Sequence, residues 1–276
     1  MVSDSLIRRL ERQAAVIRRH AIEIATEHVC HVGGALSVAD LMTALYFHVL
    51  KVDPANPAWK GRDYFILSKG HTVLAFYSAL AERGFFPVET LQAYEAKGGI
   101  LAGHPTLKAP GVEVATGSLG HGLPIGLGIA IACRVEGAPN RVFVVMGDGE
   151  MQEGSVWEAA LAAPRFGLDN LVAIIDHNRF QASNAVDNII PVEPLADKWR
   201  AFRWDTVEID GNDMAQVVAA LESASGGPKA GRPMAIVAHT VKGKGVPCLE
   251  NTPRAHYTRL TPEEAAEGLR GLEVAP

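Results

Sequence analysis

Two short polar motifs, each placed directly after an apolar run, could together bind a metal ion and a phosphate. The motif GDGE at Gly147–Glu150 follows Val142–Met146, and the motif DHN at Asp176–Asn178 follows Leu171–Ile175. Both apolar runs are short and rich in β-branched residues, which is typical of buried strands in a parallel sheet. Open α/β sheets bind ligands beyond the carboxyl ends of their strands, where both motifs would lie.

These motifs supply oxygen ligands at a spacing that suits two neighbouring strands. The separation between Asp148 and Asn178 is long enough for one strand–helix–strand crossover. A carboxylate oxygen and an amide oxygen are hard ligands, which suit Mg²⁺ that carries the phosphates of a bound molecule. An ordinary turn after each strand is the simpler alternative, and the second motif at crossover spacing argues against it.

Five of the ten histidines lie in segments rich in glycine or polar residues, from which side chains can reach a common cleft: His31, His71, His104, His121 and His256. Imidazole exchanges protons near neutral pH, so these groups are candidates for acid–base chemistry. A single histidine is more often structural than catalytic, so the functional interpretation depends on several of them meeting in one place.

Other binding chemistries receive less support. Zinc would need three or four ligands, usually with a tight pair such as HExxH, and the chain has only one HxxH, at His28–His31. Gly126–Gly128 opens no GxGxxG motif, and no GxxxxGK[ST] occurs. The segment Lys242–Gly245 follows a predicted strand and is compatible with a phosphate contact or with a solvated turn.

The elements that must position these residues alternate along the chain. Hydrophobic periodicity predicts helices over 4–29, 122–136, 154–166, 213–224 and 261–271, and strands over 64–67, 142–146, 171–175, 206–209 and 235–238. A further helix begins near Ser37 or Asp40, and another follows His71. Thr261 and Glu264 form a capping box for the last helix.

Alternating strands and helices with short links predict an α/β fold, a doubly wound parallel sheet flanked by helices. The glycine-rich stretch Ser225–Gly231 is interpreted as a surface turn, so residues 1–276 are expected to form a single domain. Residues 98–122 form a long loop, and long loops inside compact chains are usually functional.

Composition excludes several classes of protein. The 276 residues are 48% hydrophobic and 21% charged, and the net charge of −5 gives no reason to expect nucleic acid or membrane partners. Three cysteines without a CxxC pattern indicate a reducing compartment. Residues 1–20 carry arginines and no apolar stretch of a signal peptide, so a cytoplasmic location is expected.

Taken in order, the motifs resemble the N-terminal, diphosphate-binding half of transketolases over nearly the whole chain. The matching segments are His31–Ser37 (HPGG type), Leu67–His71 (LSxGH), Gly103–Pro105 (GHP), Thr116–Gly122 (TGSLGQG), Gly147–Gly154 (GDGxxxEG), Asp210–Asp213 (DGHD) and Thr240–Gly245 (TxxGxG). The pairing of GDG with the later asparagine also resembles the diphosphate motif of thiamine diphosphate enzymes in general.

The resemblance implies thiamine diphosphate as cofactor, together with Mg²⁺, or Ca²⁺ or Mn²⁺ in its place. The metal ligands would be Asp148, Asn178 and the backbone carbonyl of Phe180. The residues that it implies for cofactor binding are His71, Gly117, Leu119, Gly147, Asp148, Gly149, Glu150 and Asn178.

The implied activity is transfer of a two-carbon ketol unit from a ketose or ketose phosphate to an aldose or aldose phosphate. His31, His104 and His256 would face the donor and handle its hydroxyl protons. Glu153 and Glu158 match acids at the subunit interface of the family, although acids near a helix N-terminus are also favourable for the helix dipole alone.

The chain ends where full transketolases continue into pyrimidine-binding and C-terminal domains. It therefore resembles the N-terminal subunit of a split transketolase, and we expect a C-terminal partner subunit in an α2β2 heterotetramer. Two alternatives stay open: a subunit of another thiamine diphosphate enzyme, such as a 2-oxo acid dehydrogenase, and a non-catalytic scaffold subunit.

The sequence departs from the family pattern at four places near the predicted site. Val32 replaces a proline, His121 replaces a glutamine, and His177 precedes the asparagine of the metal motif. His256 precedes Tyr257, where the family has a His-Gly pair. These departures leave the identity of the donor sugar open.

Overall fold

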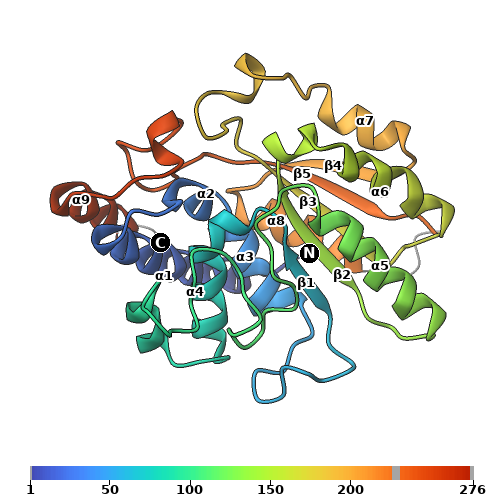
Figure 1. Ribbon diagram of the computed structural model, residues 1–276, viewed down its shortest axis with the longest axis horizontal. Helices are drawn as coiled ribbons and strands as arrows, with labels where there is room; N and C mark the ends of the chain where they lie inside the picture. Colours follow the sequence, from blue (N-terminus) through green and yellow to red (C-terminus); the bar gives the residue numbers. More distant parts are fainter. Residues whose placement is uncertain (1, 226–230, 274–276) are drawn as a thin grey trace.

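The computed structural model describes residues 2–225 and 231–273, and its centre is a five-stranded parallel sheet. The strands are β1 (Tyr64–Leu67), β2 (Val142–Gly147), β3 (Leu171–His177), β4 (Asp205–Asp210) and β5 (Met234–His239). Their order in the sheet is β1-β2-β3-β5-β4, and every neighbouring pair is parallel (Figure 1). All five strands coincide with the predicted ones, so the predicted fold class is confirmed.

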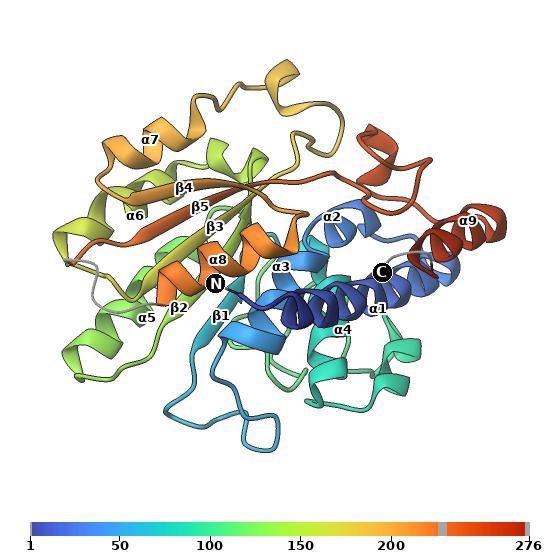
Figure 2. The same cartoon turned by 180° about the vertical axis from the view of Figure 1, so that it is seen from behind.

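The helices are α1 (Asp4–Glu27), α2 (Val32–Ser37), α3 (Ala39–Ala44), α4 (Val73–Arg83), α5 (Gly122–Val135), α6 (Gly154–Arg165), α7 (Leu195–Ala201), α8 (Met214–Ser225) and α9 (Pro262–Glu273). They cover both faces of the sheet, as the opposite views in Figure 1 and Figure 2 show. Alternate strand residues supply the two cores. Phe143 and Val145 pack with α1, α3, α4 and α8, whereas Val144 packs with α5, α6 and α7.

Two short helices were not predicted. Helix α2 contains Gly33 and Gly34, which disfavour helix by about 1 kcal/mol each relative to alanine. Tertiary packing overrides this preference, because a Cβ on Gly33 would lie 2.3 Å from the Ala255 carbonyl oxygen. Helix α7 has only seven residues, too few to show a clear period, and the buried Leu195 and Trp199 hold it against the sheet.

The remaining elements differ little from the sequence prediction. The predicted helix near Ser37 or Asp40 is α3, which continues as a π-helical turn over Leu45–Val49. The capping box of α9 is present, since the Thr261 amide donates to Glu264 (3.0 Å) and the Glu264 amide donates to the Thr261 hydroxyl (3.2 Å). Most of the predicted turn at Ser225–Gly231 lies outside the described residues.

None of the described helices is long and apolar enough to cross a membrane.

Candidate active site

The carboxyl ends of β1, β2, β3 and β5 meet at one edge of the sheet and surround a cavity of about 300 Å³. Strand register places Gly147 beside Asp176, and Asp176 beside Ala238, so the ends of three strands converge there. The cavity is lined by His31, Gly34, Lys69, His71, His104, Gly117, Leu119, Gly147, Asp148, Gly149, Glu150, Asn178, Phe180, Gln181, Ala182, Lys242 and His256. All the predicted catalytic, cofactor and metal residues are in this set.

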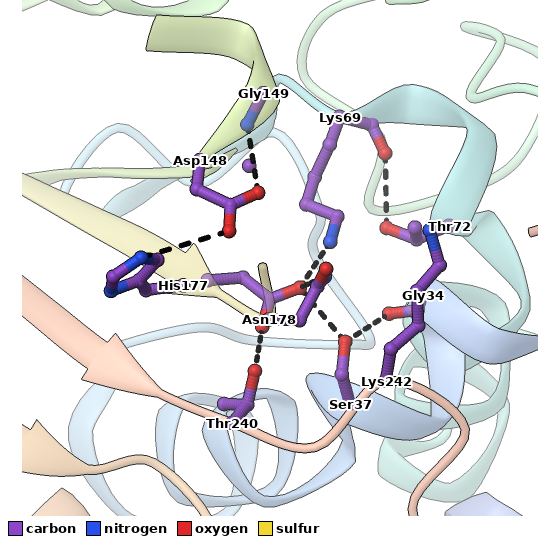
Figure 3. Close-up of polar contacts among 12 residues, drawn as sticks. Gly34, Ser37, Lys69, Thr72, Asp148, Gly149, His177, Asn178, Thr240 and Lys242 are labelled. Carbon is purple, nitrogen blue, oxygen red and sulfur yellow. Dashed lines mark hydrogen bonds and ion pairs between the residues drawn. The ribbon is translucent and has the colours of Figure 1, made fainter. Parts of the chain in front are cut away.

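Asp176 is the centre of a buried polar network next to the cavity, and Figure 3 shows the side chains of its partners Ser37, Lys69, Asn178 and Thr240. Its buried carboxylate accepts hydrogen bonds from the Ser37 hydroxyl (2.8 Å) and the Asn178 amide (2.7 Å). It also accepts from the Lys69 ammonium and the Thr240 hydroxyl. Burial alone would raise the pKa of Asp176, but Lys69 and these hydrogen bonds hold the pKa below its usual range. The network fixes the ends of β3 and β5 relative to α2 and the loop after β1.

Asp148 and Asn178 are held by backbone amides and keep oxygen lone pairs for a ligand. Asp148 accepts from the amides of Gly149 (2.7 Å) and Arg179, and the Asn178 side-chain oxygen accepts from the Phe180 amide (3.1 Å). Burial, and then the charge of Asp176, raises the pKa of Asp148 to about 7. A cation beside this carboxylate would offset both effects, so the donor set fits a hard divalent ion.

Lys242 is a buried cation whose hydrogen bonds reach no carboxylate among the described residues. Its Nζ donates to the carbonyls of Phe180 (3.0 Å) and Gln181 (3.2 Å) and lies 3.2 Å from Nδ1 of His256. Burial, and then the charge of Lys69, lowers the pKa of Lys242 to about 8. A buried ammonium group without an anionic partner is costly, so this part of the cavity fits an anion such as a diphosphate.

Glu150 joins three loops. Its carboxylate accepts from the Ser68 hydroxyl, from the Gly120 amide (2.8 Å) and from the Gly147 amide (3.2 Å). Burial raises the pKa of Glu150, although these hydrogen bonds oppose the rise. These contacts show how Glu150, one of the predicted cofactor-binding residues, positions the loops that contain Gly147 and Gly117.

The outer part of the cavity is a cluster of histidine rings. Ring centroids lie 5.1 Å apart for His31 and His71, 5.1 Å for His31 and His256, 5.3 Å for His71 and His256, and 6.0 Å for His31 and His104. The ring of Tyr257, which is exposed, lies 4.6 Å from that of His31. Three predicted catalytic histidines and one predicted cofactor residue are therefore neighbours, although they come from distant segments of the chain.

Burial keeps most of this cluster neutral. Burial, and then the charges of His104 and Lys242, lowers the pKa of His31 to about 4. Burial and the charge of Lys242 lower the pKa of His256 to about 3, and burial and Lys69 hold the pKa of His71 well below its usual value. Neutral imidazoles can accept as well as donate a proton, which is the state needed to handle substrate hydroxyl groups.

Several predicted residues lie outside the cavity. His121 is exposed, its Nδ1 lies 3.1 Å from the Leu119 carbonyl oxygen, and it lines a neighbouring hollow of about 640 Å³. Glu153 and Glu158 are exposed at the start and on the outer surface of α6, so within this chain they are not buried acids. His177 is buried beside Asp148, and its Nε2 lies 3.2 Å from a Glu193 carboxylate oxygen.

The histidines of the HxxH segment have different neighbours. His28 contacts Tyr94 with ring centroids 5.3 Å apart, whereas His31 belongs to the cavity cluster. In the described part of the chain, no three His, Cys, Asp or Glu side chains are grouped to hold a metal ion. A larger hollow of about 720 Å³ lies at the end of α1 against α9 and contains His28 but none of the predicted site residues.

Sequence reasoning did not assign three polar residues that line the cavity, Lys69, Gln181 and Lys242, or the buried Asp176 that Lys69 contacts. Lys69 occupies the variable position of the LSxGH segment, and Asp176 begins the DHN motif, so both were close to recognised signals. Lys242 was open to two interpretations, and its burial places it in the cavity instead of in a solvated turn. No sequence signal marks Gln181.

This fold and cavity define an α/β domain that can hold a phosphorylated cofactor and a metal ion at the carboxyl edge of its sheet. Residues 10–274 match the family model for the transketolase thiamine diphosphate binding domain, and the chain belongs to that family. The family assignment made from the motifs is thus confirmed, and relatives of nearly equal length confirm that the chain is a transketolase subunit.

One such relative is a subunit of the apulose-4-phosphate transketolase of Phocaeicola vulgatus, which is 41% identical over 95% of this chain and 92% of that protein. Another is the 6-deoxy-6-sulfo-D-fructose transketolase subunit SqwG of Clostridium sp., which is 42% identical over 96% of each chain. The solved transketolase of Campylobacter jejuni superposes with a TM-score of 0.88 at 27% identity. That match covers 99% of this chain but 43% of the transketolase, so the chain spans about two fifths of a full-length enzyme.

Proposed function

We propose that this chain is the N-terminal subunit of a split transketolase. With its partner it would transfer a two-carbon ketol unit from a ketose or ketose phosphate to an aldose or aldose phosphate. The observation that carries the proposal is one cavity in which a buried cation without an acidic partner, hard oxygen ligands and a neutral histidine cluster lie together. This combination suits a cofactor diphosphate at one end and a polyhydroxylated substrate at the other.

The inner end of the cavity would hold the cofactor. Asp148, Asn178 and the carbonyl of Phe180 would bind Mg²⁺, while Lys242 faces the diphosphate. Gly149 lets the backbone approach this ligand, since it carries no side chain. Thiamine diphosphate, when bound, supplies the electron sink for breaking and forming the carbon–carbon bond.

The outer end would hold the sugar. In the described part of the chain, the rings of His31 and His104 have no hydrogen-bond partner, so their nitrogens are available to donor hydroxyl groups. His31, His104 and His256 would orient the donor and take up or return a proton at its hydroxyl oxygens. The histidine cluster favours ketose cleavage over the 2-oxo acid dehydrogenase chemistry that the GDG…N pairing alone would also allow.

An uncovered apolar surface supports assembly with other subunits. Helices α5 and α6 expose Ile125, Val135 and Leu161, and Phe166 is exposed directly after α6; the fractional exposures of Val135 and Leu161 are 82% and 67%. Exposed apolar surface of this kind marks protein contacts. We propose that the chain assembles with a C-terminal, pyrimidine-binding partner as an α2β2 heterotetramer, in which Glu153 and Glu158 would lie at an interface.

We also propose a cytoplasmic location. All three cysteines are unpaired, which supports this location.

The proposal also covers the chemical class of the natural sugar substrates. Two relatives are named for apulose 4-phosphate and 6-deoxy-6-sulfo-D-fructose, both of which carry an anionic group. We propose a sugar or sugar phosphate donor of this general class. The residues that bind its charged end would come largely from the partner subunit.

The test is ketol transfer from xylulose 5-phosphate to ribose 5-phosphate with thiamine diphosphate and Mg²⁺. The assay is run with this chain alone, with the co-purified partner, and with a complex that carries Asp148→Asn. We expect transfer only in the wild-type complex. A wild-type complex that decarboxylates 2-oxo acids but cleaves no ketose would favour the alternative enzyme class, and one that binds no thiamine diphosphate would indicate a scaffold subunit.

A further inference from the structure

The loop after β3 holds Gln181 at a fixed place beside the candidate diphosphate site. The Gln181 amide donates to the Asn184 carbonyl (2.9 Å), and the Val186 amide donates to the Arg179 carbonyl (2.9 Å). Phe180 and Ala185 form an antiparallel bridge across the same loop. The Gln181 carbonyl accepts from the Lys242 ammonium at 3.2 Å. The backbone of Gln181 is therefore tied to both the loop and the buried cation.

The side chain of Gln181 carries a buried donor that the protein does not satisfy. Its Nε2 is shielded from solvent and has no hydrogen-bond partner in residues 2–225 and 231–273, although buried polar groups are normally paired. The side chain lines the same cavity as Asp148 and Asn178. It packs over Gly149, since a Cβ there would lie 2.7 Å from Cγ and 3.2 Å from Nε2 of Gln181. Figure 3 shows Gly149 next to Asp148 at this end of the cavity.

We propose that Gln181 is a further cofactor-binding residue, whose side-chain N–H donates to a phosphate oxygen of the cofactor diphosphate. The inference rests on the proposed function, in that thiamine diphosphate is the ligand. A phosphate oxygen is the natural partner for a donor that lies among Lys242, Gly149 and the metal ligands. Gly149 serves the same arrangement, because any larger residue there would displace the Gln181 side chain.

The contact is tested by the binding of thiamine diphosphate with Mg²⁺ to the two-subunit complex, measured by titration calorimetry. Gln181→Met keeps the approximate shape but has no N–H, and we expect about 10- to 100-fold weaker binding, as for loss of one hydrogen bond to a charged group. Gln181→Glu places a negative charge beside the diphosphate, and we expect still weaker binding. Ser183→Ala, at an exposed position in the same loop, is the control and should bind like the wild type.

Magnesium pyrophosphate, used as a competitor, shows which part of the cofactor is contacted. It should lose affinity for the Gln181→Met complex by the same factor as thiamine diphosphate does. A loss for thiamine diphosphate with unchanged pyrophosphate binding would overturn the proposal, and so would unchanged binding of both ligands.

Thermal unfolding of this chain without cofactor separates a binding role from a structural one. The donor is unpaired in the protein, so Gln181→Met should leave Tm unchanged or raise it. A lower Tm, with unaltered cofactor affinity of the folded complex, would assign Gln181 a structural role and contradict the inference. If the wild-type complex itself binds no thiamine diphosphate, the proposed function fails, which is a different result from failure of Gln181 alone.

Discussion

The two ends of the cavity are built by different means. At the inner end, carboxylates and ammonium groups are buried together, and Asp176 accepts hydrogen bonds from four side chains. At the outer end, the rings of His31, His71 and His104 are positioned by packing and by contact with other rings. The charged groups at the inner end suit a cofactor that stays bound. At the outer end, ring nitrogens without hydrogen-bond partners among the described residues can serve a substrate that must enter, react and leave.

This comparison predicts that substitutions at the inner end affect stability and cofactor binding, whereas those at the outer end affect turnover. The largest effect is expected for Lys69→Met, which leaves the fully buried Asp176 without its closest cation. Removal of one partner of a buried ion pair costs about 3–5 kcal/mol. Urea unfolding at pH 7 should show a loss of this size. Lys244→Met, at a less buried position without an ion-pair partner among the described residues, should change stability by less than about 0.5 kcal/mol.

Asp148→Asn should separate cofactor binding from stability. Loss of a carboxylate ligand should weaken the binding of Mg²⁺ and thiamine diphosphate to the complex more than about 100-fold, beyond the effect of removing an outer-shell partner. The same change should leave unfolding of the cofactor-free chain unchanged or shift it upward, because burial and Asp176 already disfavour the charged form of Asp148. Asp187→Asn, an exposed carboxylate in the following loop, is the matched control. Equal cofactor affinity in both variants would remove Asp148 from the site.

The sequence predicted the strands well, and it also predicted that Asp148 and Asn178 lie at one cavity, because both depend on local pattern. Val142–Met146 and Leu171–Ile175 are apolar on both sides, as strands covered by helices on both faces must be. The carboxyl ends of two such neighbouring strands have to meet, which is why the sequence alone places Asp148 near Asn178. The histidine cluster was predicted from the glycine-rich or polar context of its residues together with the resemblance, because no spacing rule brings His31, His104 and His256 together.

The parts that the sequence did not reveal depend on tertiary packing. Lys242 follows a strand in a Gly-rich segment, and only the fold shows that its ammonium is buried against the Phe180 carbonyl. In the sequence, Gln181 is an ordinary polar residue of a loop. Only the fold shows that its side chain packs over Gly149 and that its Nε2 is buried. Helix α2 forms despite its two glycines because Thr72, directly before α4, packs against Gly34 and Ala255 packs against Gly33.

At the outer end of the cavity, His104→Ala should lower kcat/KM for ketol transfer about 10- to 100-fold. A decrease of this size corresponds to the loss of one or two hydrogen bonds to the reacting sugar. Affinity for thiamine diphosphate should stay within about 3-fold, because the ring contact of His104 is with His31, and none of its described hydrogen bonds reaches Lys242 or Asp148. His121→Ala is the comparison variant, since His121 is exposed in the neighbouring hollow. If His104→Ala instead weakens cofactor binding and leaves turnover by the saturated enzyme intact, the division between the two ends is wrong.

The smallest effect expected is a pH dependence of stability that differs in sign between the two ends. The folded-state pKa values of His31 and His256, about 4 and about 3, lie below the unfolded value of 6.5. The unfolded chain therefore binds more protons between pH 6.5 and about 4, and these histidines destabilise the fold as pH falls through that window. Asp148 acts in the opposite sense, because its pKa of about 7 exceeds its unfolded value of 3.8 and acid stabilises its folded form.

The measurement is the change in the urea midpoint between pH 7 and pH 5. The midpoint of Asp148→Asn should fall more over this range than that of the wild type, and adding His256→Asn should restore part of the difference. A wild-type midpoint that falls as steeply as that of Asp148→Asn would show that Asp148 makes no opposing contribution.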